Sequence, residues 1–107
     1  MNARLDGSVL YEVTLDVDAA IEAEYRVWLH EHVAAMLEID GFRSARVFEV
    51  LEPAPSHGRI GLCVAYDVRD DAALRRYFER DAARMRAEGL ARFGTKTIAT
   101  RRVLRSG

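Results

Sequence analysis

His32 is the residue of this sequence whose type and spacing best suit acid–base chemistry. It follows Trp28 by four residues and precedes Met36 by four, so on a helix the three side chains share one apolar face. An imidazole changes charge near neutral pH and can serve as a general acid, as a ligand to haem or metal, or as a hydrogen-bond donor to a bound molecule. The alternative is a neutral histidine whose ring nitrogen bonds a backbone carbonyl or a carboxylate. No second histidine or carboxylate stands at ligand spacing, so the sequence favours this alternative and predicts no metal site.

Asp81 is the second titratable residue on an apolar stripe, between Phe78 and Met85 of a later predicted helix. A buried carboxylate without a partner is costly or becomes protonated, so we expect Asp81 to have a partner. If both helices cover the same face of one sheet, His32 is one candidate partner, and Tyr25 or an arginine is another. A structural pair is favoured over a catalytic dyad, because structural ion pairs also perturb pKa values.

The elements that must position these groups follow from hydrophobic periodicity. Alternating apolar residues predict strands over residues 8–17, 42–52, 59–68 and 96–104. Apolar residues at three- and four-residue spacing predict a helix that Asp18 caps and that runs to about Ile39. A second helix is capped by Asp70, frays near Gly89 and stops at Gly94.

The order strand, helix, strand, strand, helix, strand predicts a single domain over residues 1–107 with a ferredoxin-like α+β fold. Four antiparallel strands form the sheet, and both helices lie on one face of it. Right-handed crossovers place the first and third strands in the centre. The bulky faces of these two strands, from Val9 to Val17 and from Ile60 to Val68, then form the core beneath the helices.

The opposite face of this sheet carries small and polar side chains at its centre and apolar ones at its edges. Its central residues are Glu12, Thr14, Gly61, Cys63 and Ala65, with Val47 or Phe48 at one side. Four strands cannot close a barrel, so a second copy of the chain is the simplest cover. We therefore predict a homodimer, a dimeric α+β barrel in which two sheets face each other. Between them the sheets either pack tightly or enclose a cavity where Glu12 and an arginine such as Arg46 or Arg101 hold a polar ligand.

The composition argues against several classes of protein. The chain has 107 residues, of which 16 are basic and 17 acidic, and it lacks the clustered Lys and Arg of a nucleic-acid-binding protein. The single cysteine, Cys63, cannot form an internal disulfide, which favours the reducing cytoplasm. Residues 1–7 lack the apolar core of a signal peptide, and no apolar run approaches the ~18 residues that span a membrane. No Gly-rich phosphate loop or Cys/His metal spacing occurs, so no cofactor is predicted.

Several segments together resemble the uncharacterised DUF4286 family. They are Leu10-Tyr11-Glu12-Val13, Asp16-Val17-Asp18, Tyr25 with Trp28-Leu29-His30-Glu31-His32-Val33, Asp40-Gly41-Phe42 and Ala91-Arg92-Phe93-Gly94. The similarity spans nearly the whole chain, and the helix segment around Trp28 and the Arg-Phe-Gly helix end are its distinctive parts. The resemblance implies a ferredoxin-like domain related to the dimeric α+β barrels and supplies no activity. It also implies histidines on the second helix, where this chain has Asp81 and Gly89.

Three hypotheses for function follow. The leading one is a homodimer that binds a small, partly apolar molecule in a cleft between sheet and helices. The second is a cofactor-free enzyme of the dimeric α+β barrel type, a monooxygenase or a haem-degrading protein. In it His32 acts as acid, base or axial ligand, and Trp28, otherwise buried mass in the core, shapes the pocket. The third is a structural or partner-docking protein that uses the row of Arg76, Arg80 and Arg84.

Overall fold

The computed structural model describes residues 7–107. The sequence predicts no signal peptide in residues 1–7, and residues 1–6 of this segment lie outside the described residues. In chain order the elements are β1 (Val9–Asp18), α1 (Glu22–Met36), β2 (Phe42–Glu49), β3 (Arg59–Val68), α2 (Asp71–Arg80), α3 (Ala82–Phe93) and β4 (Thr97–Arg105), with short 3₁₀ turns at Ala19–Ile21 and Gly94–Lys96. None of the helices in this range has the length and apolarity needed to cross a bilayer.

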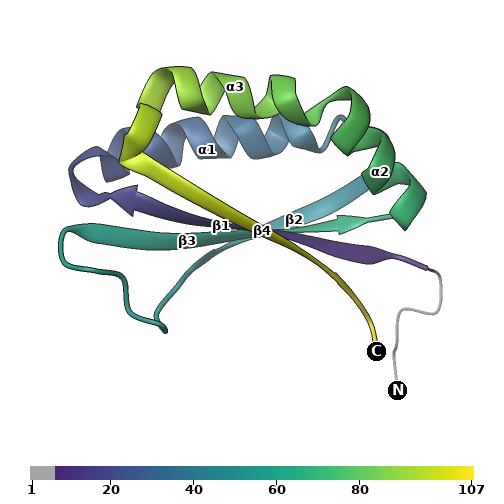
Figure 1. The fold of residues 1–107 in the computed structure, drawn as a ribbon, viewed down its shortest axis with the longest axis horizontal. Coiled ribbons are helices and arrows are strands. Elements are labelled where there is room, and N and C mark those ends of the chain that lie inside the picture. The colour runs from purple at the N-terminus through teal and green to yellow at the C-terminus, as the bar shows by residue number, and fades with distance from the viewer. Residues whose placement is uncertain (1–6) are drawn as a thin grey trace.

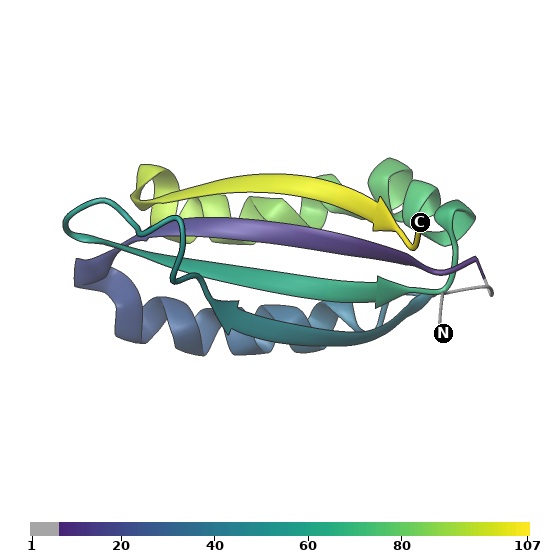
Figure 2. The same cartoon turned by 90° about the horizontal axis from the view of Figure 1, so that it is seen from below.

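The four strands form one antiparallel sheet in the order β2-β3-β1-β4. The prediction that the first and third strands lie in the centre is therefore confirmed, as is the ferredoxin-like α+β fold of the dimeric α+β barrel class. All three helices lie on one face of the sheet, and the loop between β2 and β3 hangs on the other side (Figure 1). Seen from below, the four strands run side by side with the helices behind them (Figure 2).

The core lies between the helices and the bulky faces of β1 and β3. Alternate residues of the two central strands are buried, as the period-two pattern predicts: Val9, Tyr11, Leu15 and Val17 on β1, and Leu62, Val64, Tyr66 and Val68 on β3. Tyr25, Trp28, Leu29 and Met36 of α1 cover them, together with Leu74 and Tyr77 of α2 and Met85 of α3. The helices thus meet a surface of large side chains, several of them aromatic.

The predicted cap of the second helix is confirmed at Asp70, whereas Asp18 caps the short 3₁₀ turn Ala19–Ile21 that leads into α1, whose own N-cap Ile21 makes no side-chain bond. The Asp18 carboxylate accepts a hydrogen bond from the backbone N–H of Ala20 at 2.9 Å, and the Asp70 carboxylate accepts one from Ala73 at 2.8 Å. Two predicted ends are too late, since α1 ends at Met36 and β2 ends at Glu49. Element ends are the least reliable part of such a prediction, because local hydrogen bonds settle them.

The second helix is not continuous as predicted, because the chain breaks it at Asp81. The backbone angles of Asp81, φ −122° and ψ −25°, end α2 and begin α3. Aspartate is a weak helix former that favours helix ends, so a break at this residue is reasonable. The break also divides the predicted row of arginines, in which Arg76 pairs with Asp40 at 3.2 Å and Arg84 pairs with Asp81 at 2.8 Å.

Candidate functional site

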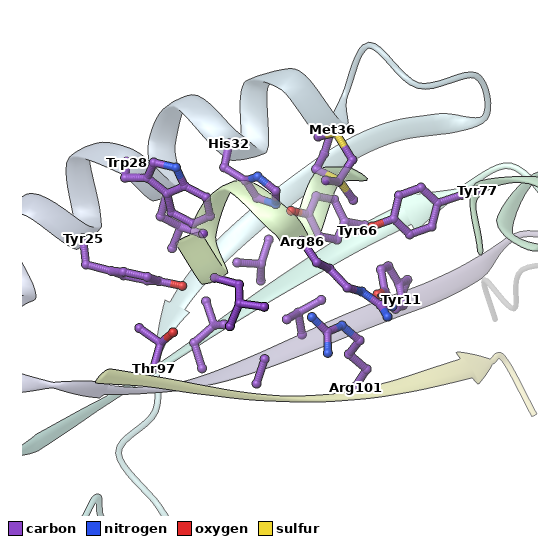
Figure 3. A pocket seen from close by; sticks show the side chains of 18 of the residues that line it. Tyr11, Tyr25, Trp28, His32, Met36, Tyr66, Tyr77, Arg86, Thr97 and Arg101 are labelled. Atoms are coloured by element: carbon purple, nitrogen blue, oxygen red, sulfur yellow. Dashed lines mark hydrogen bonds between the residues drawn. The ribbon is translucent and has the colours of Figure 1, made fainter. Parts of the chain in front are cut away.

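A cavity of about 310 Å³ lies between the helices and the covered face of the sheet (Figure 3). Side chains of β1, β3 and β4 line one side, and side chains of α1, α2 and α3 line the other. Leu90 of α3 lines it with 68% of its surface exposed, as do the exposed residues Arg86 and Arg101, so the cavity opens between α3 and β4. Its volume lies near the low end of the ~300–1,000 Å³ typical of ligand pockets.

Aromatic rings form much of the wall. Tyr11 and Tyr66 face each other across β1 and β3 with their ring centroids 5.9 Å apart, and Tyr77 lies 5.9 Å from Tyr11. Further along the cavity, Tyr25 lies 5.5 Å from Trp28. Between these rings the lining is aliphatic, for example Leu15 and Val64. Flat aromatic walls with aliphatic residues between them suit a planar, partly apolar molecule.

Three tyrosines of the wall are hydrogen-bond donors at neutral pH. Burial raises the pKa of Tyr25 and of Tyr77 to about 12, and it also raises the pKa of Tyr66. Their phenol groups therefore keep their protons across the physiological range. The hydroxyl of Tyr11 accepts a hydrogen bond from Nη2 of Arg86 at 3.3 Å.

Trp28 is held in place by two contacts with α3 and is only 7% exposed. Its indole N–H donates to Oε1 of Glu88 on α3 at 3.3 Å. Gly89 lies directly against the ring, since a Cβ added there would be 2.7 Å from Cη2 of Trp28. The prediction that Trp28 is buried in the core is thus confirmed, and the same side chain also lines the cavity.

His32 lines the cavity beside Trp28 (Figure 3). The two rings stack with centroids 4.6 Å apart and planes 18° from parallel. Burial lowers the pKa of His32 below the usual 6.5, Glu88 opposes this shift and Arg101 adds to it, so the imidazole is neutral at pH 7. Within residues 7–107 the His32 side chain has no hydrogen bond to a carbonyl or a carboxylate. Its neutral ring, with one nitrogen that donates and one that accepts a hydrogen bond, therefore faces the cavity.

Asp81 pairs with an arginine, Arg84, which is one of the kinds of partner that the sequence analysis left open. Its carboxylate lies 2.8 Å from Nη2 of Arg84, and its own side chain is 29% exposed. The charged residues that act on His32 are Glu88 and Arg101. Asp81 and His32 are therefore not brought together as a dyad, because the helix break turns Asp81 into a helix end.

Glu12 and Arg46 lie on the face of the sheet away from this cavity. Glu12 pairs with Arg102 at 2.8 Å, and the guanidinium of Arg46 lies 4.8 Å from the centre of the Phe48 ring. Their role toward a ligand between two sheets stays a prediction. Arg101 was expected on that same face, which is wrong, because its register opposite Val13 turns it toward the helices and into the cavity.

The sequence analysis missed Arg86 as a residue of the site. It follows the buried Met85 on α3 and reaches the cavity from the helix side. Arg86 precedes Gly89 by three residues, so on a helix the two lie on the same side. Because Gly89 lies against Trp28, this spacing is the signal that could have placed Arg86 at the cavity. Within residues 7–107 no three His, Cys, Asp or Glu side chains gather as a metal ion would need.

A comparison with protein families matches residues 8–106 to a domain of unknown function, DUF4286. The chain belongs to the DUF4286 family. The match confirms the resemblance seen in the sequence and covers both sides of the cavity. No curated protein matches this DUF4286 chain in sequence.

Solved structures share the fold of this DUF4286 domain at low sequence identity. A variant of SnoaB, a cofactor-independent oxygenase from Streptomyces nogalater, is 14% identical with a TM-score of 0.69, and 92% of each chain is covered. A conserved protein from Methanosarcina mazei is 13% identical with a TM-score of 0.70 over 95% of each chain. A protein from Deinococcus radiodurans, proposed to be an antibiotic biosynthesis monooxygenase, is 18% identical with a TM-score of 0.69 over 92% of each. These similarities establish the fold alone.

The lowered pKa of His32 predicts how the stability of this DUF4286 domain depends on pH. The unfolded chain binds a proton near pH 6.5, whereas the folded chain binds it only at lower pH. The free energy of unfolding should therefore fall as the pH drops below 6.5. Above pH 6.5 the His32 imidazole is neutral in both states, so it should leave the free energy of unfolding unchanged. Urea unfolding at pH values from about 5 to 8 measures the slope.

The variant His32→Gln should flatten this slope, because it removes the titrating group. The matched control is His30→Gln, which changes an exposed histidine of the same helix and should keep the slope of the natural chain. An unchanged slope in His32→Gln would show that the imidazole is not desolvated in the fold.

Proposed function

We propose that this protein is a homodimer that binds a small, planar, partly apolar molecule in the cavity between its sheet and helices. The observation that carries the proposal is the cavity itself, lined by aromatic rings and by His32. Convergent polar groups in a mainly apolar cavity are the usual form of a ligand site. With Cys63 as its single cysteine the chain has no internal disulfide to form, which supports a cytoplasmic location.

The size of the cavity favours a molecule of one to three fused rings over a macrocycle. Its volume of about 310 Å³ is small for a ligand pocket. Trp28 and Gly89 also seal its end between α1 and α3, since the ring already touches the glycine. This argues against haem as the ligand, one of the options that the sequence left open for His32.

Filling the cavity should abolish binding of such molecules. Ala99 of β4 lines the cavity, so Ala99→Phe places a ring in the ligand's space. The control is Val103→Phe on the same strand and the same face, beyond the residues that line the cavity. A thermal-shift screen of planar aromatic metabolites measures the effect, because a ligand at a hundred times its Kd stabilises by about 2.7 kcal/mol.

We expect hits with the natural chain and with Val103→Phe, and none with Ala99→Phe. Far-UV circular dichroism checks that each variant folds. Hits that persist undiminished in Ala99→Phe, or no hit at all with the natural chain, would count against a ligand in this cavity.

The second candidate is a cofactor-free oxygenase that uses the same cavity. The specific observation in its favour is His32, a neutral imidazole that faces the cavity and can accept a proton from a bound phenol or enol. SnoaB, one of the proteins with this fold, is described as a cofactor-independent oxygenase. In this function Trp28 would hold the ring of the substrate and His32 would be its general base.

Oxygen uptake separates the two candidates. A binding protein leaves the rate of O₂ consumption by a bound phenolic hit unchanged, whereas an oxygenase raises it. In an oxygen electrode, His32→Gln should then lower the catalysed rate by the ~10²–10⁴-fold that general-base catalysis supplies. The control His30→Gln should keep that rate. Uptake no faster than without protein would remove the oxygenase candidate.

The homodimer is supported by the uncovered face of the sheet. Phe48 at one edge is 41% exposed and Ile98 at the other is 56% exposed. The acids of this face are neutralised within the chain, Glu12 by Arg102 at 2.8 Å and Asp16 by Arg59 at 2.7 Å. A face that meets its own copy across a two-fold axis is helped by paired charges, and these two pairs reduce the repulsion between identical acids there.

A charge placed on this face should therefore dissociate the dimer. Ile98→Asp and Phe48→Asp should each shift the mass in sedimentation from twice the chain mass of 12.1 kDa toward a single chain. The control is Val27→Asp, which changes a residue on α1 that is 63% exposed and should leave the mass unchanged. A single chain in the natural protein, or a dimer that survives both sheet variants, would contradict an interface on this face.

A further inference from the structure

Among residues 7–107, the lining of the cavity contains two arginines and no acidic residue. Arg86 and Arg101 both line it, and none of the other lining residues is Asp or Glu. The chain as a whole has 17 acidic residues against 16 basic ones, so this local excess of positive charge is not a consequence of composition. The cavity is therefore a positively charged site in a nearly neutral protein.

The two arginines approach the cavity from opposite sides. Arg101 extends from the edge strand β4 on the face that bears the helices, and Arg86 extends from α3. The Arg86 guanidinium lies beside Tyr11, whereas the charge of Arg101 also acts on the pKa values of Tyr25 and His32 nearer to Trp28 (Figure 3). The hydrogen bond from Arg86 to the Tyr11 hydroxyl fixes one of the two groups.

Neither arginine is neutralised within residues 7–107. Elsewhere on the surface, guanidinium groups pair with carboxylates, as Arg59 does with Asp16 and Arg102 does with Glu12. Arg86 and Arg101 form no such ion pair among the described residues. Both guanidinium groups line the cavity with donors that no carboxylate of the described residues occupies, so an anion bound there finds charged hydrogen-bond donors on two sides.

We infer that the ligand is a planar aromatic carboxylate, with its ring against Trp28 and His32 and its carboxylate between Arg86 and Arg101. The inference rests on the proposed ligand-binding function and names the class of ligand. A carboxylate has two oxygens that each accept more than one hydrogen bond, so it can bind both guanidinium groups at once. The aromatic wall between the two ends of the cavity accommodates the ring.

Two probes of nearly the same shape, one a carboxylate anion and the other a neutral amide, test the inference. They are 2-naphthoate and 2-naphthamide, which share one ring system and one carbonyl. Isothermal titration measures their affinities for the natural chain, for Arg86→Gln and for Arg101→Gln. The control is Arg105→Gln on β4, outside the cavity lining and on the same face of the sheet as Arg101.

We expect the natural chain to bind 2-naphthoate at least about tenfold more tightly than 2-naphthamide, since a hydrogen bond to a charged group commonly contributes that much. Each cavity variant should lose about tenfold in affinity for the carboxylate while its affinity for the amide changes little. Arg105→Gln should bind both probes as the natural chain does. The preference for the carboxylate should also weaken as the salt concentration rises.

Two further outcomes separate the inference from the function on which it rests. If the amide and the carboxylate bind with equal affinity, the cavity binds ligands but the carboxylate assignment is wrong. If neither probe binds to the natural chain, or if Ala99→Phe binds both undiminished, the ligand site itself is wrong and the inference falls with it.

Discussion

The stacking of Tyr11 on Tyr66 determines how far the helices stand from the sheet. The two residues are opposite each other in the central strand pair, and their rings stack 5.9 Å apart on the covered face. Phe42 and Tyr77 pack edge-on or tilted against them and fill this end of the core. Further along, the same face of the sheet carries shorter side chains, such as Val13 and Ala99. The helices are rigid and pack on large aromatic side chains at one end of the sheet. They therefore cannot also contact the smaller side chains further along, and a cavity remains between them and the sheet.

The sequence predicts the sheet well because the central strands have a strong periodic signal. Val9 to Val17 and Ile60 to Val68 alternate bulky with small or polar residues, and only one face of such a strand can be buried. The edge strand β4 has no such signal, since Arg101 and Arg102 are neighbours and point to opposite faces. Periodicity could therefore not decide which of the two faces the helices.

The cavity could not be predicted from the sequence for a different reason. Its volume depends on where side chains leave space unfilled, and that is decided by strands and helices that meet only in the folded chain. Gly89 shows this, since in the sequence it marks a fraying helix, whereas in the structure it makes room for the Trp28 ring. His32 and Trp28 were identified from spacing because they share one helix, while Arg86 and Arg101 come from elements that the sequence does not relate.

The positions of the arginines couple the ligand to the protonation of His32. Arg101 disfavours the imidazolium form of His32, and Glu88 favours it. Burial is the largest cause of the lowered pKa of His32, and a ligand that displaces water from the imidazole strengthens this effect. An anion beside Arg101 acts in the opposite direction, because it cancels part of the charge that disfavours the imidazolium form. The ring and the carboxylate of one ligand therefore have opposing effects on the pKa of His32, and by linkage the affinity depends on pH through this residue.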